Sequence, residues 1–445
     1  MNNELEIRKI ALETLTEYEN GEIPSHILLK KVLDKYDYMP SKDKAIISTI
    51  VKGTIERRTE LDYIINLYSK TQTDKMKKII RIIIETGVYQ IKYMDVYDTA
   101  AVNLSVNLAK KKGFTGLSGF VNGVLRSVSS NKDAIPYPDT NTKEYISIKY
   151  SMPEYVVSLL TNQYDRETVL KICEDSLQNA ELSLRFKAGL SEERKREILS
   201  VLNERKVSYR NVEGIDNVIK IVSAGDISKL DAFKKGEVTV QDASSVIMCE
   251  NVPCGKRILD ACAAPGGKSM YLAEKYHDSH IVSCDISPDK LTRMNDNFIR
   301  AGLKNTEVVL WDATEYKEEW AESFDVVVAD VPCSGLGVMR KKQDIKYNVT
   351  KEKLDSLTEI QRNILKNVSQ YVKKGGYLCY STCTVNKDEN ERQIEEFLKD
   401  SGFVSAKLSF VPNGLEKYVS KECLQLIQGV NDTDGFFIAV MKKNG

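Results

Sequence analysis

The sequence predicts three domains: an all-α N-terminal domain, a small α+β middle module, and a C-terminal α/β domain with a doubly wound parallel sheet. Three observations support this prediction. The 445 residues are enough for two to four domains of roughly 100–200 residues each. Apolar residues recur at helical spacing up to about residue 130, and short β-branched runs alternate with helical patterns from about residue 236. The predicted boundaries are 1–138, 142–232 and 236–445.

The first domain is predicted to be helical throughout. Apolar residues return every three or four positions in "IRKIALETL", "LDYIINLY", "MKKIIRIIIETGVYQI" and "AAVNLSVNLAKK". The segment "SSNKDAIPYPDTNT", with Pro136 and Pro138, is the clearest linker in the chain. Beyond it, "PEYVVSLLTNQY" and "RETVLKICED" favour two helices, and "AELSLRFKAG", "SEERKREILSVLNERK" and "NVIKIVSAG" indicate a strand, a helix and a strand.

The last domain is predicted from six short strand-like runs separated by helical patterns. Such alternation is typical of βαβ units and a parallel sheet. The runs are "RILDAC", "HIVSCD", "TEVVLW", "FDVVVAD", "GGYLCYSTC" and "GFFIAVMKK".

Composition narrows the class of protein. Lys plus Arg and Asp plus Glu each number 64, so any contact with nucleic acid must come from local patches. The nine cysteines form no C-x-x-C pair and only three histidines are present, so we expect no metal site. Unpatterned thiols, no signal peptide and no membrane span predict a cytoplasmic protein without membrane contact, and we expect a monomer.

The turn after "RILDAC" resembles a phosphate-binding loop at its end but not at its start. A P-loop needs glycine six positions before Lys268, and the residue there is Cys262. The dinucleotide-binding motif G-x-G-x-x-G does not match this turn either. A strand, a small-residue turn and a helix still suit a nucleoside-type ligand. The predicted turn contacts are Cys262, Ala263, Ala264, Pro265, Gly266, Gly267 and Lys268.

Three carboxylates are predicted to lie at successive strand ends of one sheet: Asp285, Asp312 and Asp330. Each alone is equally well explained as a cap of the following turn. Together they favour a ligand with a ribose, an adenine edge and no polyphosphate. S-adenosylmethionine fits this description, because its sulfonium favours a site rich in carboxylates and aromatic rings.

Two cysteines are also predicted to lie at this sheet edge. Cys333 follows the strand that ends at Asp330, and Cys383 ends the next strand. A thiol and a carboxylate beside a methyl donor suit methylation of a pyrimidine at C5, because thiolate addition to C6 makes C5 nucleophilic. This chemistry alone leaves open which cysteine attacks.

Together, "DACAAPGGKS", "DVPCSGLG" and "YSTCT" resemble the RNA 5-cytosine methyltransferases of the NOP2/NSUN/RsmB class. The resemblance implies a Rossmann-like domain that uses S-adenosylmethionine. It also implies that Cys383 is the nucleophile, that Cys333 assists product release, and that Asp330 meets both cofactor and cytosine. "ERRTELDYII", "AAVNLSVNLAKKKG" and "FVNGVLRSV" are similar to the NusB helical RNA-binding domain. The combination implies small-subunit (16S) ribosomal RNA as the substrate.

Local charge offers candidates for RNA contact. Residues 70–112 hold nine Lys or Arg and four Asp or Glu, although such a run is most often a solvated helix face. Further candidates are Arg57, Arg58, Arg126 and the segment "MRKKQDIK" at 339–346. Two other functions stay open at this point. Gly-Lys-Ser is compatible with a nucleotide-hydrolysing P-loop enzyme, and the helical domain is compatible with a non-catalytic RNA-binding factor.

Overall fold

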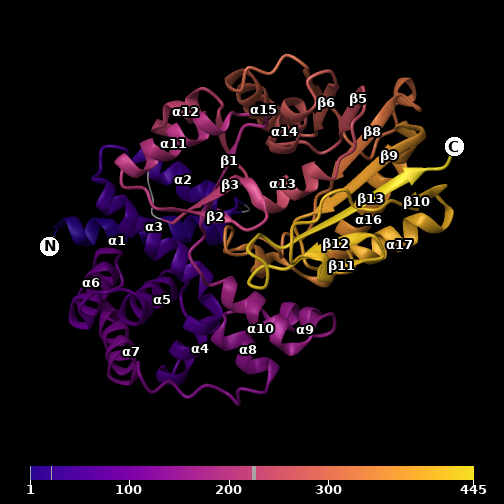
Figure 1. Ribbon diagram of the computed structural model, residues 1–445. Helices are drawn as coiled ribbons and strands as arrows, with labels where there is room; N and C mark the ends of the chain where they lie inside the picture. Colours follow the sequence, from indigo (N-terminus) through magenta and orange to yellow (C-terminus); the bar gives the residue numbers. More distant parts are fainter. Residues whose placement is uncertain (1, 22, 223–226) are drawn as a thin grey trace. The chain divides into compact units, whose positions relative to one another are not determined.

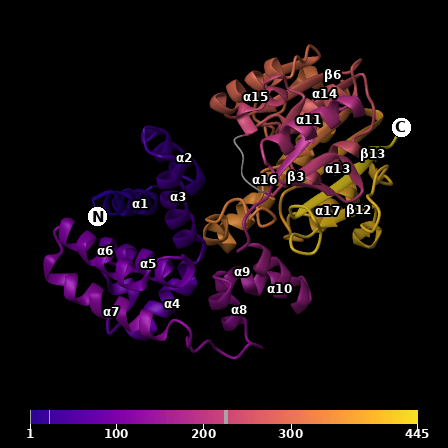
Figure 2. The ribbon, with the colours of Figure 1, turned by 60° about the vertical axis from the view of Figure 1, so that its left-hand side comes forward.

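The computed structural model describes residues 2–21, 23–222 and 227–445 and contains two compact units (Figures 1 and 2). The helical unit comprises 1–178 and 339–349, and the sheet unit comprises 179–338 and 350–445. The chain therefore returns to the helical unit for eleven residues shortly after Cys333. The three domain boundaries given above stay a prediction.

The helical unit is all-α among its described residues, as predicted. The apolar faces of the helices between residues 2 and 131 share one core, in which Ile50, Ile64, Ile83 and Leu125 are fully buried. Local capping fixes helix starts: the Asp165 side chain accepts from the Thr168 amide at 2.9 Å. Its helices are α1 (Asn2–Asn20), α2 (Ser25–Lys35), α3 (Ser41–Glu56), α4 (Arg58–Tyr68), α5 (Lys78–Tyr93), α6 (Asp98–Lys111), α7 (Ser118–Asn131), α8 (Lys143–Lys149), α9 (Glu154–Thr161) and α10 (Arg166–Asp175).

The returning segment, 339–349, is held by polar contacts within the helical unit. Asp344 Oδ2 accepts from the Ser25 amide at 2.8 Å, and Arg340 Nη1 pairs with Asp175 Oδ1 at 2.8 Å. Lys346 is 1% exposed, and its Nζ has no hydrogen-bond partner among the described residues. Lys346 and Arg340 are therefore not available to grip RNA, because one is buried and the other is engaged by Asp175. RNA contact by the rest of the segment 339–346, in which Lys342 is exposed, stays a prediction.

Replacing Lys346 with methionine is expected to raise the free energy of unfolding by about 1–3 kcal/mol at pH 7, because a buried ammonium group without a hydrogen-bond partner among the described residues gives way to an apolar side chain of similar size. Burial lowers the pKa of Lys346 from 10.5 to about 8. As the pH rises, Lys346 therefore loses its proton in the folded protein before it does in the unfolded chain. The destabilisation caused by the buried Lys346 charge is full below pH 8 and disappears toward pH 10.5. Urea unfolding at pH 7 and pH 10 measures this difference.

The matched control for this prediction is Lys342→Met, at an exposed lysine of the same segment. It should change stability by no more than about 0.5 kcal/mol. A clear loss of stability in Lys346→Met would show that the amine is stabilised by a favourable interaction, which would contradict the prediction.

The sheet unit begins with a four-stranded antiparallel sheet in the order β2-β3-β1-β4. The predicted strand, helix and strand correspond to β1 (Leu182–Phe186), α11 (Glu192–Glu204) and β3 (Ile215–Ile221), and the end of "NVIKIVSAG" lies outside the described residues. The sequence analysis missed β2 (Tyr209–Val212) and β4 (Val238–Val240), which are short. A buried ion pair, Arg185 Nη1 to Glu274 Oε2 at 2.6 Å, joins β1 to α14 (Gly267–Lys275).

The large sheet has the order β11-β12-β13-β9-β8-β5-β6-β7, with β10 paired to β13. Its five strands β7, β6, β5, β8 and β9 are parallel, and all six predicted runs are strands. The sheet is mixed rather than purely parallel, because the strands from β10 onward pair antiparallel. The bounds are β5 (Arg257–Asp260), β6 (His280–Asp285), β7 (Thr306–Leu310), β8 (Phe324–Asp330), β9 (Val372–Thr382), β10 (Phe403–Ser405), β11 (Val419–Ser420), β12 (Cys423–Leu426) and β13 (Phe436–Lys443).

Helices cover both faces of this sheet, because alternate residues of the central strands are apolar on both sides. Ile258 and Val326 pack with α13 (Ala243–Glu250) and α14, whereas Leu259 and Val327 pack with α16 (Lys351–Val368) and α17 (Glu391–Asp400). The remaining helices of this unit are α12 (Asp231–Lys234) and α15 (Pro288–Arg300). The result is a Rossmann-like three-layer fold, as predicted.

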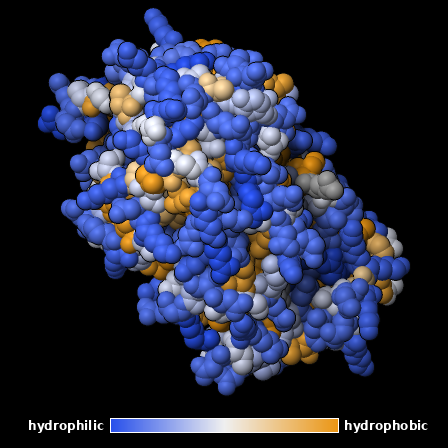
Figure 3. Space-filling view, turned by 90° about the vertical axis from the view of Figure 1, so that its right-hand side faces the viewer, coloured by the Kyte–Doolittle hydropathy of each residue, from blue (hydrophilic) through white to orange (hydrophobic). Residues whose placement is uncertain are grey.

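The strand order reverses between β5 and β8, since the chain continues from β5 to β6 and β7 on one side and from β8 to β9 on the other. In such sheets ligands bind outside the carboxyl ends of the strands at this reversal. The face shown in Figure 3 is mostly hydrophilic, with hydrophobic residues in small groups. Within the described ranges, every helix is too short or too polar to span a bilayer.

Candidate functional site

The glycine turn joins β5 to α14 at the strand-order reversal. Gly266 has φ +96°, and a Cβ there would lie 2.6 Å from Met294 Cγ, so glycine is required for both reasons. The Ala263 amide donates to the Cys284 carbonyl at 2.7 Å, which fixes the turn against the end of β6. The turn therefore places the first amides of α14 at the carboxyl edge of the sheet.

Lys268 is bound to an acid, so its side chain is not available as a phosphate ligand. Its Nζ lies 2.7 Å from Asp330 Oδ2, and Ser381 Oγ donates to the other oxygen, Oδ1, at 2.7 Å. Burial alone would lower the pKa of Lys268, but the Asp330 carboxylate raises it above its usual value. The contacts with Lys268 and Ser381 orient Asp330 at the end of β8, and the ion pair argues against a P-loop role for Lys268.

A cavity of about 440 Å³ opens beside this turn at the carboxyl ends of β5, β6, β7 and β8. Five of the predicted site residues line it: Cys262, Ala264, Asp285, Asp312 and Asp330. The other predicted turn residues, Ala263, Pro265, Gly266, Gly267 and Lys268, do not line it. The sheet edge thus brings together the three carboxylates, as expected from their positions after successive strands.

Two of these carboxylates also cap the turns that follow them. Asp285 Oδ1 accepts from the Ser287 amide at 3.0 Å, and Asp312 Oδ1 accepts from the Thr314 amide at 2.8 Å. Asp285 and Asp312 therefore do cap the turns that follow them, which is the alternative explanation given for them above. The two roles are compatible, because both side chains cap a turn and still line the cavity.

The sequence analysis missed several cavity residues. Ile286, Trp311 and Ile364 provide apolar walls, and Lys290 lies 3.6 Å from Asp285. Ile286 and Trp311 flank the two predicted acids in the chain, which is a signal that could have identified them. Ile364 comes from α16, a helix far along the sequence, and nothing in its own pattern distinguishes it from an ordinary core residue.

The two cysteines are in contact. Cys333 Sγ and Cys383 Sγ lie 3.3 Å apart, because β8 and β9 pair in parallel and both residues follow the paired strand ends. A hydrogen bond to Cys383 and burial raise the pKa of the Cys333 thiol, and the nearby Glu389 carboxylate adds to this effect. The Cys333 thiol therefore keeps its proton at neutral pH.

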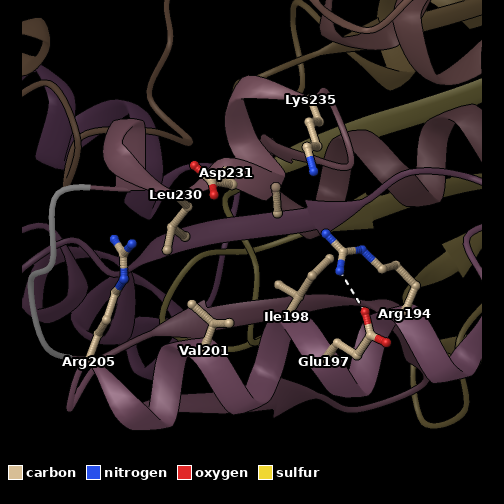
Figure 4. Close-up of a pocket in the computed structure, with 9 residues that line it drawn as sticks. Arg194, Glu197, Ile198, Val201, Arg205, Leu230, Asp231 and Lys235 are labelled. Carbon is tan, nitrogen blue, oxygen red and sulfur yellow. Dashed lines mark hydrogen bonds and ion pairs between the residues drawn. The ribbon is translucent and has the colours of Figure 1, made fainter.

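A second cavity, of about 260 Å³, lies between α11 and α12 in the sheet unit (Figure 4). It has three basic residues, Arg194, Arg205 and Lys235, and Arg194 Nη1 is paired with Glu197 Oε2 at 2.6 Å. None of the predicted site residues lines this cavity. The chemistry-bearing groups therefore gather at the edge of the large sheet.

The predicted basic face of the helical unit is only partly available to solvent. Arg81 pairs with Glu19 at 2.5 Å, and Lys92 lies 3.3 Å from the buried Glu60. Arg57 and Arg58 are also paired with acids. The exposed basic residues of the predicted run are Lys70, Lys75, Lys77, Lys78, Lys110 and Lys111, and Arg126 is exposed as well.

Comparisons with known proteins agree with this architecture. Residues 248–442 match the family described as 16S rRNA methyltransferase RsmB/F, and residues 5–130 match the NusB family. The chain is 31% identical, over 99% of both sequences, to the probable ribosomal RNA small subunit methyltransferase B of Bacillus subtilis.

Two solved structures share the fold. PH0851 has a TM-score of 0.79 and 20% identity, covering 98% of this chain and 99% of that one. NSun6 from Pyrococcus horikoshii, solved with SFG, has a TM-score of 0.55 and 18% identity, covering 69% of this chain and 99% of that one. The full-length relationship to the Bacillus subtilis protein shows that the chain belongs to the RsmB/F family of 16S rRNA methyltransferases.

Proposed function

We propose that the protein transfers a methyl group from S-adenosylmethionine to C5 of a cytosine in 16S ribosomal RNA, through a covalent adduct between Cys383 and C6. One observation supports this proposal most directly: two thiols in contact, 3.3 Å apart, follow strand ends beside Asp330, which lines the carboxylate-rich cavity. S-adenosylmethionine dependence and ribosomal RNA methylation are properties of the family to which the chain belongs. The cytosine, its C5 position and the adduct are the proposed part.

The cavity suits S-adenosylmethionine chemically. Its volume of about 440 Å³ is within the range of small-molecule sites. Asp285 and Asp312 offer acceptors for the ribose hydroxyls and the adenine edge, and Trp311 and Ile364 offer apolar walls. When bound, this cofactor supplies an electrophilic methyl group. The protein's own contribution is to hold acceptors in place through the Ser287 and Thr314 contacts.

Cys383 is proposed as the nucleophile. Its thiolate forms a bond to C6, and the C5–C6 π electrons move to C5, which then takes the methyl group. Asp330, held by Lys268 and Ser381, is proposed to contact the N3 side of the ring, where charge develops. After transfer, C5 loses its proton, the C6–sulfur bond breaks, and the sulfur leaves with the bonding pair.

Cys333 is proposed to assist this last step. Because the pKa of Cys333 is raised by its hydrogen bond to Cys383 and by burial, it can return a proton to the departing Cys383 sulfur. This division of roles agrees with that implied by the family resemblance.

Ribosomal RNA is proposed to contact the exposed lysines of the helical unit, including Lys75, Lys77 and Lys78. Each phosphate contact removed should flatten the dependence of log K on log salt by about 0.7–0.9. The target base must be unstacked or single-stranded to reach a thiol, at a cost of a few kcal/mol when it is stacked.

Methyl transfer from labelled S-adenosylmethionine to unmodified 16S rRNA, followed by mapping of 5-methylcytosine, tests the proposal. Label at C5 of a single cytosine is the expected result. Label on another atom or base would contradict the cytosine-C5 assignment. Binding of ATP with magnesium in calorimetry, with S-adenosylhomocysteine ignored, would instead favour the P-loop alternative, and an absence of transfer would favour a non-catalytic RNA-binding factor.

Asp285→Ala is expected to weaken S-adenosylhomocysteine binding by roughly 10- to 100-fold, because hydrogen bonds to charged groups contribute about 1.5–3 kcal/mol. Isothermal titration calorimetry measures the change. The matched control is Asp289→Ala, at an exposed acid four residues later that does not line the cavity. Equal affinities for both variants would place the cofactor elsewhere.

A further inference from the structure

We propose that Glu389 is a positioning residue that keeps the Cys333 and Cys383 sulfurs in contact by accepting hydrogen bonds from both cysteine loops at once. The inference rests on the proposed function for the roles of the two thiols. It concerns a side chain that neither the motifs nor the cavity lining identify.

The Glu389 side chain is fully buried, at 0% exposure, yet it is surrounded by donors. Its Oε1 accepts from the Ser334 amide at 2.7 Å and from Gln361 Nε2 at 3.1 Å. Its Oε2 accepts from Ser334 Oγ at 2.6 Å and from Asn386 Nδ2 at 3.0 Å. Thr384 Oγ1 also donates to Oε2, at 3.5 Å. Five donors therefore converge on one buried carboxylate, and a buried polar group needs such partners.

Four of these donors belong to the two loops that carry the thiols, and the fifth, Gln361, lies on α16. Ser334 follows Cys333 directly in the chain, and Asn386 lies three residues after Cys383. Gln361 adds a third point of support, because its Nε2 also donates to the Pro332 carbonyl at 2.9 Å. The residues on both sides of Cys333 are thus fixed by groups that contact the same carboxylate.

Direct contacts between the loops run parallel to this bridge. Ser334 Oγ lies 2.7 Å from Thr384 Oγ1, and the Gly337 amide donates to the Cys383 carbonyl at 3.0 Å. Tyr380 Oη donates to the Glu389 carbonyl at 2.6 Å, which ties the backbone of Glu389 to β9. The backbone of Glu389 is thus held in place, so its side chain can fix the position of the Cys333 loop.

Both side-chain oxygens of Glu389 accept hydrogen bonds in this arrangement. A glutamine in the same place has one acceptor oxygen, and its amide would point two donors at groups that already donate. Glu389→Gln therefore preserves the volume of the side chain but removes at least half of the hydrogen bonds that it accepts. Glu389→Asp keeps the charge on a shorter side chain and is expected to restore part of the effect.

The distance between the sulfurs can be probed without any turnover. Diamide oxidises two neighbouring thiols to a disulfide: the sulfurs form one bond and give up two electrons and two protons, and the N=N bond of diamide becomes a hydrazine. Mass spectrometry after rapid alkylation then gives the rate at which Cys333 and Cys383 are joined. This rate reports how often the two sulfurs meet in the folded, full-length protein.

We expect Glu389→Gln to slow the Cys333–Cys383 oxidation at least tenfold, with Glu389→Asp intermediate. The matched control is Glu396→Gln, at an exposed acid of α17 that pairs with Arg362, and it should oxidise at the wild-type rate. Circular dichroism at the assay temperature verifies that each variant is folded. Should Glu389→Gln not fold, Ser334→Ala removes only the hydroxyl contact and should slow oxidation by a smaller, measurable factor.

Two results would overturn the inference: wild-type oxidation rates in folded Glu389→Gln, or in Ser334→Ala where the former does not fold. A loss of methyl transfer with unchanged oxidation would likewise assign Glu389 some other role. If oxidation depends on Glu389 but no variant, wild type included, methylates cytosine, the positioning role stands and the proposed function fails. The two claims are thereby separated.

Discussion

Replacing Cys383 with alanine is expected to abolish methyl transfer to 16S rRNA, with a loss on the order of 10⁴-fold or more, as for other removed nucleophiles. The reason is chemical: C5 of cytosine is too weak a nucleophile to take a methyl group unless a thiolate first adds to C6. Single-turnover transfer from labelled S-adenosylmethionine measures the loss. Cys383 does not line the cavity that holds Asp285 and Asp312, so affinity for S-adenosylhomocysteine should stay within about twofold of wild type.

The control for this variant is Cys254→Ala, at an exposed cysteine outside the site. It should retain full activity. If Cys383→Ala kept more than a small fraction of wild-type turnover, the covalent mechanism would have to be abandoned, or the nucleophile would have to be Cys333.

The site residues that could be predicted from the sequence are those that lie at or just after the ends of strands. Asp285 and Asp330 are the last residues of β6 and β8, and Cys383 follows the last residue of β9. Parallel strands in a doubly wound sheet place their carboxyl ends at one edge, so a position after a strand already implies a place in the site. This is why the three carboxylates and two thiols were found together.

Other features were missed because they depend on pairing between distant segments. Glu389 lies in a polar loop, "NKDEN", whose composition indicates only a solvated turn. Its burial arises when the Cys333 loop supplies donors from more than fifty residues earlier. Lys346 is similar: a lysine in a basic run is normally exposed, and only the return of 339–349 into the helical unit buries it.

Most of the short strands after β9 could not be predicted from the sequence. β10, β11 and β12 are two to four residues long, too short for a reliable alternation of apolar and polar residues. They pair antiparallel with β13 or with each other, and the pairing of β10 with β13 joins segments that are distant in the sequence. They lie away from the strand-order reversal, so missing them changed the predicted sheet but not the predicted site.

Cys333→Ala is expected to trap the covalent protein–RNA adduct, visible as a species of reduced mobility on a denaturing gel. Loss of a general acid slows a step by about 10²–10⁴-fold, and the step lost here is release of the Cys383 sulfur. Cys333 Sγ lies 3.3 Å from Cys383 Sγ, which places it to act as this acid, whereas Lys268 is bound to Asp330. The adduct should therefore form and persist.

The double variant Cys333→Ala/Cys383→Ala decides which sulfur carries the RNA. It should give no adduct, because the nucleophile is absent. Incubation of Cys333→Ala without S-adenosylmethionine should give less adduct than incubation with it, because methylation of the ring precedes release of the sulfur. An adduct in Cys383→Ala alone would reverse the two roles. In that case the raised pKa of Cys333 would no longer mark a proton donor. The Asp330–Lys268 pair would then serve the thiol in the loop after β8 rather than the one that follows β9.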